Sequence, residues 1–379
     1  MTAPFDFTPL LAPGTPAPAV KWNGFPKYNF IGGHNDAKHV PVDALIAAAT
    51  AVLKREGATL ATYGLNSGPL GYRPLREFLA GKLKGHAGID CSPDEILITS
   101  GSMQGLDLIN SLLVAKGDTV LIEQETYGGA LTKLNKIGAN VVGIPLDDEG
   151  LRLDVLEAKL EELKKKGVTP KYIYTIPTVQ NPTGAIMGEA RRRALIALAA
   201  KYGVMIFEDE CYSDLIWSGT RPTSLYALAG GEGVIHIGSF SKSIAPALRV
   251  GYIVAKWDIL GRILGLKQDA GSGALEQMVL AEFCKQHFAQ HVPKLNKALS
   301  AKQQALREAL AEQYHARRDD GGILAIKAEA QQAKAAAAQA QVEAPQFTLE
   351  HLLGDYADHL EFQGRRSHAD VRSIVRLHV

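Results

Sequence analysis

The stretch GSFSKSIAPALR, residues 238–249, decides how this chain is interpreted. It follows the apolar, β-branched run VIHI at residues 234–237, which predicts a buried strand. A single lysine, Lys242, follows that strand among small and hydroxyl-bearing residues. A lysine amine in an apolar, partly cationic site loses proton affinity and becomes a nucleophile that can form a Schiff base. We therefore expect Lys242 to be a nucleophile beside an anion site, most simply a phosphate site, formed by Ser239, Ser241 and Arg249.

Bulk composition excludes several classes of protein. With 379 residues, the chain is long enough for a large domain and a smaller one. Its net charge of +1 gives no electrostatic argument for nucleic acid or an anionic membrane as partner. Its cysteines are far apart, which argues against a disulfide framework and a zinc site and favours a reduced compartment; they are Cys91, Cys211 and Cys284. Without an apolar run of membrane-spanning length or a signal-like N-terminus, the expected location is the cytoplasm, with no metal and no membrane.

From residue 41 onward, short apolar runs alternate with amphipathic segments. The predicted strands are Glu95–Thr99, Thr119–Glu123, Asn140–Ile144, Tyr172–Ile176, Val204–Glu208, Val234–Ile237 and Arg249–Val254. The predicted helices include Val42–Glu56, Arg73–Lys84, Met103–Leu113, Val155–Lys166 and Arg191–Tyr202. This alternation predicts an α/β fold with a mostly parallel sheet covered on both faces. In such sheets, ligands bind beyond the carboxyl ends of the strands.

The two ends of the chain have a different character. Residues 1–40 are rich in Pro and Gly and indicate an irregular N-terminal arm. We expect a large domain over residues 41–290 and a smaller α+β domain over residues 291–379, to which the arm contributes. In the latter, a long helix is expected near Val292–Tyr314 and a strand near residues 321–326. The segment 328–341 is almost entirely Ala, Gln and Lys, which indicates an exposed or poorly packed helix.

Two motifs follow predicted strands and could bind a ligand through hydrogen-bond donors. Ser102 and Met103 begin a predicted helix, where free N–H groups and the helix dipole favour an anion, although an ordinary strand–helix turn has the same pattern. Asn181 opens the sequence NPTG, residues 181–184, which is also suited to a plain turn. In the functional interpretation, its amide donates to a ring hydroxyl or a substrate carboxylate.

Three further positions have both an ordinary and a functional interpretation. Asp209 lies at the end of an apolar strand, where acidic residues are usually solvated, but a carboxylate aimed into a site can keep a pyridine nitrogen protonated. Tyr127 could stack on a planar cofactor or merely cover the edge of the core. Tyr63 stands at the start of a Gly-rich loop that leads into a helix.

Taken together, these motifs resemble those of the fold type I pyridoxal-phosphate (PLP) enzymes. The resemblance is to class I/II aminotransferases of the branch that includes 2-aminoadipate and kynurenine aminotransferases. It runs from about Tyr63 to Val254 and more weakly to about Tyr314. It implies a three-layer α/β large domain with a smaller α+β domain, and pyridoxal 5′-phosphate as the cofactor.

The resemblance also implies a role for each motif residue. Lys242 matches the Schiff-base lysine, Asp209 matches the partner of the pyridine nitrogen, and Tyr212 and Asn181 match donors to the cofactor's 3-hydroxyl. Tyr127 matches the aromatic residue that stacks on the ring. The matches to phosphate ligands are Ser102, Met103, Ser239, Ser241 and Arg249. Tyr63 matches a tyrosine that reaches the phosphate from the other subunit, which implies a homodimer.

The chain departs from the family where the substrate would bind. The sequence GGHND, residues 32–36, replaces the usual Gly-x-Pro-Asp. Gly33 is the expected substrate contact in this segment, and Asn181 is a second expected substrate contact elsewhere in the chain. Near the C-terminus, Arg376 is the match to the arginine that binds the substrate α-carboxylate, and Arg372 is its rival.

The expected activity is a ping-pong transfer of an amino group between an α-amino acid and a 2-oxo acid, with Lys242, Asp209 and Tyr212 as catalytic residues. A PLP-dependent lyase or decarboxylase could use the same site. The PLP-binding domain of a transcriptional regulator is a further alternative, but the Pro/Gly-rich lead-in does not resemble a DNA-binding module. A nicotinamide dehydrogenase fits less well, because no Gly-x-Gly-x-x-Gly follows a strand.

Overall fold

The computed structural model describes residues 5–12, 15, 17–26, 29 and 32–318. The chain divides into two units, Met1–Pro293 and Lys294–Val379. The sheet and the residues considered below lie in the first unit. Of the second unit, residues 294–318 are described, and they are helical.

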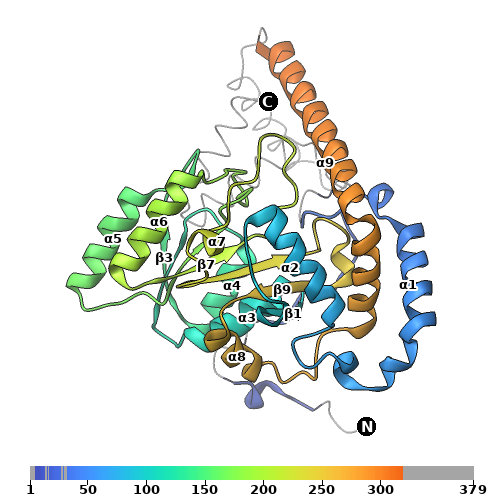
Figure 1. Ribbon diagram of the computed structural model, residues 1–379. Coiled ribbons are helices and arrows are strands. Elements are labelled where there is room, and N and C mark those ends of the chain that lie inside the picture. Colours follow the sequence, from blue (N-terminus) through green and yellow to red (C-terminus); the bar gives the residue numbers. More distant parts are fainter. Residues whose placement is uncertain (1–4, 13–14, 16, 27–28, 30–31, 319–379) are drawn as a thin grey trace. The chain divides into compact units, whose positions relative to one another are not determined.

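A seven-stranded sheet forms the centre of the first unit (Figure 1). Its strands, in the order of the sheet, are β1 (Ile96–Ser100), β9 (Val250–Val254), β8 (Val234–Ser239), β7 (Met205–Asp209), β6 (Tyr172–Thr175), β2 (Thr119–Glu123) and β3 (Asn140–Ile144). Neighbours from β8 to β3 are parallel, whereas β9 is antiparallel to both β8 and β1. All seven strands coincide with predicted strands to within one or two residues, and the expected mostly parallel α/β sheet is confirmed. A separate hairpin pairs β4 (Leu146–Asp147) with β5 (Gly150–Leu151).

Helices connect the strands. The α-helices in the described residues are α1 (Val42–Glu56), α2 (Arg73–Ala87), α3 (Ser102–Leu113), α4 (Gly128–Ile137), α5 (Leu153–Lys165), α6 (Glu189–Tyr202), α7 (Leu225–Leu228), α8 (Trp257–Leu266) and α9 (Ala274–Arg318). Short 3₁₀ turns are η1 (Thr8–Leu10), η2 (Ala37–His39), η3 (Gly57–Ala61), η4 (Tyr63–Asn66), η5 (Pro93–Glu95) and η6 (Pro246–Leu248). No helix among the described residues is long and apolar enough to cross a membrane.

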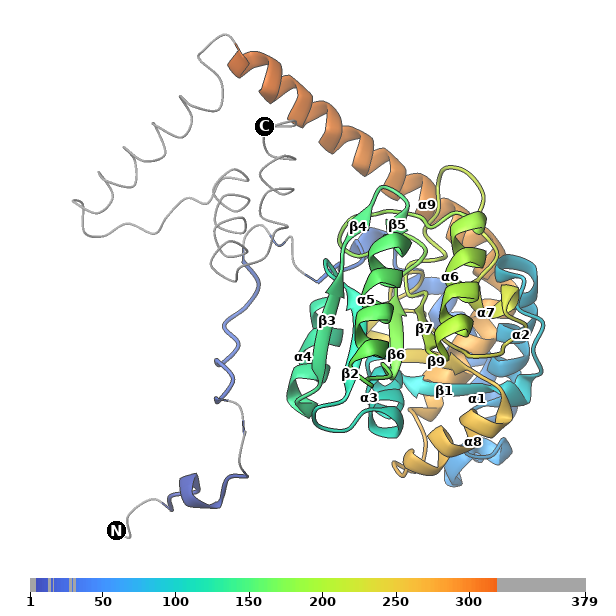
Figure 2. The same cartoon turned by 90° about the vertical axis from the view of Figure 1, so that its left-hand side faces the viewer.

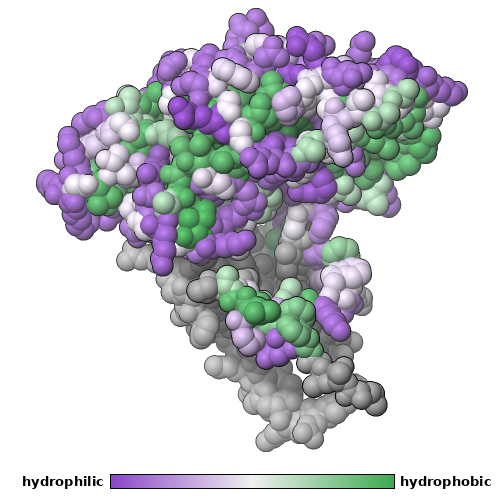
Figure 3. Space-filling view, turned by 90° about the horizontal axis from the view of Figure 1, so that it is seen from below, coloured by the Kyte–Doolittle hydropathy of each residue, from purple (hydrophilic) through white to green (hydrophobic). Residues whose placement is uncertain are grey.

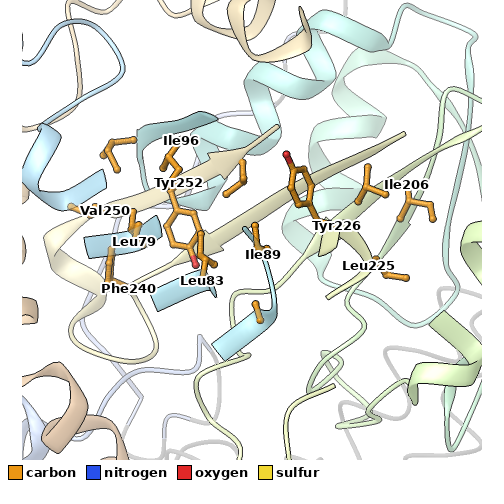
Figure 4. Close-up of a cluster of buried hydrophobic side chains, with 14 of the residues drawn as sticks. Leu79, Leu83, Ile89, Ile96, Ile206, Leu225, Tyr226, Phe240, Val250 and Tyr252 are labelled. Carbon is orange, nitrogen blue, oxygen red and sulfur yellow. The ribbon is translucent and has the colours of Figure 1, made fainter. Parts of the chain in front are cut away.

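Two hydrophobic clusters cover the two faces of the sheet, because successive side chains of a strand point to opposite faces. On β7, Ile206 belongs to one cluster and Phe207 to the other. The first cluster packs the sheet against α2, α5, α6, α7 and the start of α9, and Figure 4 shows the part of it around Tyr252 and Phe240. The second packs it against α3, α4 and α8. Figures 1 and 2 show the resulting three layers of helix, sheet and helix.

The helix predictions need two corrections. The helix expected near Val292–Tyr314 belongs to α9, which begins at Ala274 and contains Pro293 in its interior. A proline lacks the N–H that continues the helical pattern, so the sequence suggested a start near this position. Helix α4, which begins with Gly128 and Gly129, was not predicted, because glycine is a poor helix former. The strand near 321–326, the segment 328–341, Arg372 and Arg376 lie outside the described residues.

Candidate active site

The carboxyl ends of six strands lie at one edge of the sheet. The parallel strands β8, β7, β6, β2 and β3 end there, and β1 runs in the same direction because β9 is antiparallel to both β1 and β8. Arg249 immediately precedes β9 and therefore lies at the same edge. The ends of these strands and the segments that follow them carry most of the predicted site residues: Ser102, Met103, Tyr127, Asn181, Asp209, Tyr212, Ser241 and Lys242. The structure thus brings together residues that are up to 147 positions apart (249 − 102).

Lys242 lies in the turn after β8, with its amine against the N-terminal segment. Its Nζ donates to the carbonyl oxygens of Gly32 and Gly33, at 3.1 Å each, and lies 5.4 Å from the centre of the Tyr212 ring. Burial, and then the nearby positive charge of Arg249, lower the pKa of the Lys242 amine. A side chain on Gly33 would meet this amine, since an ideal Cβ would stand 3.0 Å from Nζ. A lowered pKa makes the neutral amine easier to reach than it is for a lysine in water.

Asp209 ends β7 as a buried carboxylate, 3% exposed. Its Oδ2 accepts a hydrogen bond from the Tyr174 hydroxyl at 2.7 Å, and its Oδ1 accepts from the Cys211 amide at 3.2 Å. Burial raises the pKa of Asp209 despite these hydrogen bonds. Within the described residues, no basic side chain forms an ion pair with it. Such a carboxylate fits a cation supplied by a ligand.

Three side chains could contact the ring of a planar ligand. Burial raises the pKa of Tyr212 to about 12, so its hydroxyl stays protonated and can donate. Asn181 is half-buried, follows a turn from β6, and has no hydrogen-bond partner among the described residues; its peptide bond to Pro182 is cis. The Tyr127 hydroxyl lies 3.4 Å from the Met103 sulfur, which joins the loop after β2 to the start of α3.

The start of α3 and Arg249 form a candidate anion cradle. Gly101, with φ +73°, precedes the helix, and an ideal Cβ there would stand 2.3 Å from Nη2 of Arg249. A Cβ on Gly251 would stand 2.5 Å from the Ser102 amide nitrogen. Gly101 requires glycine because of its positive φ, and Gly251 requires it because the backbone of the helix start approaches it closely. The first N–H groups of a helix have no intrahelical acceptor, so they can bind an anion beside the arginine.

Two serines complete the cradle. The Ser239 hydroxyl donates to the Ser241 hydroxyl at 2.9 Å and accepts from the Ser241 amide at 3.0 Å. Ser239 also pairs with Gly251 across the sheet, which places it next to the start of α3. Hydroxyls, a guanidinium and backbone N–H groups are the donors that phosphate accepts.

One predicted contact stands apart from this group, and another is not described. Tyr63 in η4 is 90% exposed on its own chain. Arg376 lies outside the described residues. No cluster of three or more metal-ligating side chains occurs among the residues that the structure describes.

The sequence did not reveal several residues that shape the site. Tyr174 supports Asp209 from the neighbouring strand. Glu123, at the end of β2, is fully buried, and burial raises its pKa to about 7. Gln180 joins Glu123 to the loop that carries Asn181. Their positions at strand ends were the available signal, but their partners are distant in sequence.

Residues 32–348 match the aminotransferase class I and II family. The chain belongs to this family. It is 35% identical over 284 residues to an aromatic-amino-acid aminotransferase of Thermococcus litoralis, which covers 74% of this chain and 67% of that protein. It is 34% identical to a 2-aminoadipate transaminase of Thermus thermophilus over 74% of this chain and 69% of that protein. The crystal structure of a kynurenine aminotransferase of Pyrococcus horikoshii matches with a TM-score of 0.70 and 36% identity over 74% of this chain and 69% of that chain.

This aminotransferase uses pyridoxal phosphate, as the sequence predicted. The observed residues fit that group. Asp209 is a buried carboxyl group with no basic ion-pair partner in the described part of the chain, Lys242 is an amine with a lowered pKa, and glycines open a cradle between Arg249 and Ser102.

Proposed function

We propose that this aminotransferase moves an amino group from an α-amino acid to a 2-oxo acid with Lys242 as the residue that binds the cofactor and carries the proton. The cofactor, when bound, supplies an aldehyde and an electron-accepting ring. Lys242 would supply the amine that joins the aldehyde. Once released by the substrate, the same amine would take the proton from the donor's Cα and pass it to the cofactor, and it would reverse this transfer with the 2-oxo acid. The lowered pKa of Lys242 supports both roles, because both need the neutral amine.

The other side chains hold the cofactor in this proposal. Asp209 would keep the ring nitrogen protonated, Tyr212 and Asn181 would donate to the ring hydroxyl, and Tyr127 would cover the ring. The phosphate would be held by Ser102, Met103, Ser239, Ser241 and Arg249. The closeness of Arg249 to the helix start and the hydrogen bonds between the two serines support this set.

The substrate contacts are proposed at Gly33, Asn181 and Arg376. Gly33 supports this role through its backbone, which lies against the Lys242 amine. The names of similar enzymes suggest aromatic amino acids, 2-aminoadipate and kynurenine as the first donors to test.

We also propose a homodimer with shared active sites, in which Tyr63 reaches the cofactor phosphate of the partner copy. Tyr63 is almost fully exposed. Hydrophobic patches interrupt the mostly hydrophilic described surface in Figure 3, and α1 carries exposed apolar side chains, namely Val42, Ile46 and Leu53. The proposed division is into an arm (1–40), a large domain (41–290) and a small domain (291–379). The large domain then holds the whole sheet and helices α1 to α8. Three free cysteines support a cytoplasmic location.

The observation that carries the proposal is the placement of two groups at one edge of the sheet: the Lys242 amine, whose pKa is lowered, and the buried Asp209 carboxylate, which has no ion-pair partner among the described residues. Lys242→Ala should remove the visible absorbance that the cofactor acquires on binding and lower the transfer rate by at least about 10³-fold. Lys256→Ala is the matched control, because Lys256 lies beyond the other end of β9, paired with Glu95 at 3.2 Å. An unchanged absorbance band in Lys242→Ala would contradict the proposal. A panel of amino acids, each with and without a 2-oxo acid, identifies the substrates and separates transfer from elimination or decarboxylation.

A further inference from the structure

Gln180 is a buried glutamine, 3% exposed, whose side-chain amide is fully hydrogen-bonded. Its Nε2 donates to Oε2 of Glu123 at 2.9 Å and to the carbonyl of Glu125 at 2.6 Å. Its Oε1 accepts from the amide and the hydroxyl of Thr183, at 2.8 Å each. An amide offers two donor hydrogens and two acceptor lone pairs, so all four positions are used.

These four hydrogen bonds join two loops that leave different strands. Thr183 belongs to the turn after β6 that begins with Asn181, and Glu125 belongs to the loop after β2 that leads to Tyr127. The Gln180 backbone closes the same turn, since its N–H donates to Ala185 at 2.9 Å and its carbonyl accepts from Gly184 at 2.6 Å. One side chain therefore fixes the distance between the segments that carry Asn181 and Tyr127.

Glu123, to which the Gln180 side chain donates, is itself held by several hydrogen bonds. Glu123 is buried, and besides Gln180 it accepts from the Thr175 hydroxyl and, at 3.0 Å, from the Ile176 amide. These partners lie at the end of β6 in the centre of the sheet. Asn181, by contrast, has no hydrogen-bond partner of its own among the described residues. The hydrogen bonds of the adjacent Gln180 therefore hold the segment that carries Asn181.

We propose that Gln180 is a positioning residue that places the Asn181 amide and the Tyr127 ring against the cofactor. The inference rests on the proposed contact between Asn181 and the ring hydroxyl. A glutamine is required because the position must donate toward Glu123 and accept from Thr183 at once. A glutamate there would present oxygens to the Glu123 carboxylate, and an apolar side chain would leave both sides unsatisfied.

The test uses the holoenzyme and the pH titration of the bound cofactor's visible absorbance, with Asn181→Ala, Gln180→Met and the double variant. A donor to the ring hydroxyl oxygen favours its ionised form, so loss of that donor raises the pKa of the absorbance change. Asn181→Ala should raise it by roughly one unit, and Gln180→Met should raise it in the same direction. The double variant should match Asn181→Ala, since two changes to one interaction do not add. Cofactor affinity should fall about tenfold in each.

The matched control is Gln277→Met. Gln277 is equally buried and also bridges two segments, accepting from the Tyr72 amide at 2.8 Å and donating to the carbonyls of Ser272 and Gly273 at 3.0 Å each. It should lower the melting temperature about as much as Gln180→Met but leave the pKa of the absorbance change unaltered.

The outcomes separate the inference from the function on which it rests. A titration unchanged in Gln180→Met, or a double variant whose shift is the sum of the single shifts, would overturn the positioning role. A titration unchanged in Asn181→Ala would overturn the proposed Asn181 contact and the inference with it. If Gln180→Met does not fold, Thr183→Val removes one donor to Gln180 Oε1 from an exposed position, and a smaller shift in the same direction is expected.

Discussion

Three consecutive acidic residues at the end of β7 have opposite surroundings. Glu208 and Glu210 are fully buried and are surrounded by basic side chains. Glu208 lies 2.8 Å from Nδ1 of His236 and 3.7 Å from Arg192. Glu210 lies 2.8 Å from Arg221 and 3.4 Å from Arg192. Burial alone would raise the pKa of Glu210, but Arg221 and Arg192 outweigh it and lower that pKa.

Asp209, between them, points to the other face of the strand and has no such partner in the described part of the chain. It receives hydrogen bonds from Tyr174 and the Cys211 amide, and burial raises its pKa. The fold can supply arginines to its neighbours one residue away, so the absence of one here is informative. In the proposed function, the protonated ring nitrogen of the cofactor provides the positive charge beside Asp209.

Asp209→Asn is expected to have the largest effect on activity, and it tests the difference between Asp209 and the two glutamates on the other face of β7. Loss of a buried pair between the carboxylate and the cofactor should lower kcat/KM by about 1,000-fold, equivalent to about 4 kcal/mol. The cofactor-free protein should not be weakened. The pKa of Asp209 is raised in the folded protein. The contribution of Asp209 to the stability of the wild type is therefore present at low pH and is lost as pH rises through that pKa. The stability of the variant relative to wild type should therefore increase with pH, measured by denaturant unfolding of the cofactor-free protein.

Glu210→Gln is the control with the opposite sign. Its folded pKa is lowered, so its contribution to stability is present above the unfolded pKa and is lost as pH falls. The substitution should destabilise the cofactor-free protein at neutral pH, and the difference from wild type should shrink in acid. If both variants changed stability with pH in the same direction, the contrast between the two faces would be wrong.

The second prediction concerns Glu208 and Glu210 and uses the substitution Arg192→Met. Arg192 is fully buried and serves both glutamates, so its loss should lower the free energy of unfolding by about 3 kcal/mol. Its neighbour on α6 gives the comparison. Arg193 is 60% exposed in its side chain and pairs with Glu189 at the surface, so Arg193→Met should change stability by less than about 0.5 kcal/mol. Equal losses in the two variants would show that burial does not decide the effect.

The sequence predicted the fold and the residues that follow strands. The period of the apolar residues located all seven strands, and the order of motifs along the chain located Lys242, Asp209 and Arg249 at one edge. This worked because alternating strands and helices leave few arrangements, and the strand ends then meet.

The supporting residues could not be predicted in the same way. Tyr174 meets Asp209 because β6 and β7 are adjacent and parallel, and Gln180 meets Glu123 across 57 positions. These contacts depend on strand order and on side-chain direction, and a local sequence pattern predicts neither of them. A buried arginine such as Arg192 looks in the sequence like the exposed Arg193 beside it.

The smallest effect is expected from Tyr174→Phe, which removes the hydrogen bond to Asp209 and keeps the ring. The phenol stabilises the charged carboxylate, so its loss should raise the pKa of Asp209 further and weaken its hold on a protonated nitrogen. A hydrogen bond to a charged group is worth about 1.5 kcal/mol, so kcat/KM should fall about tenfold. Tyr172→Phe is the matched control, because Tyr172 is buried on the same face of β6, packs edge-on against the same Phe207 and donates instead to Asn110. It should lower stability by a similar amount and leave kcat/KM unaltered. A loss of activity in both would mean that β6 acts through the packing of the sheet, and that Asp209 does not depend on its phenol partner.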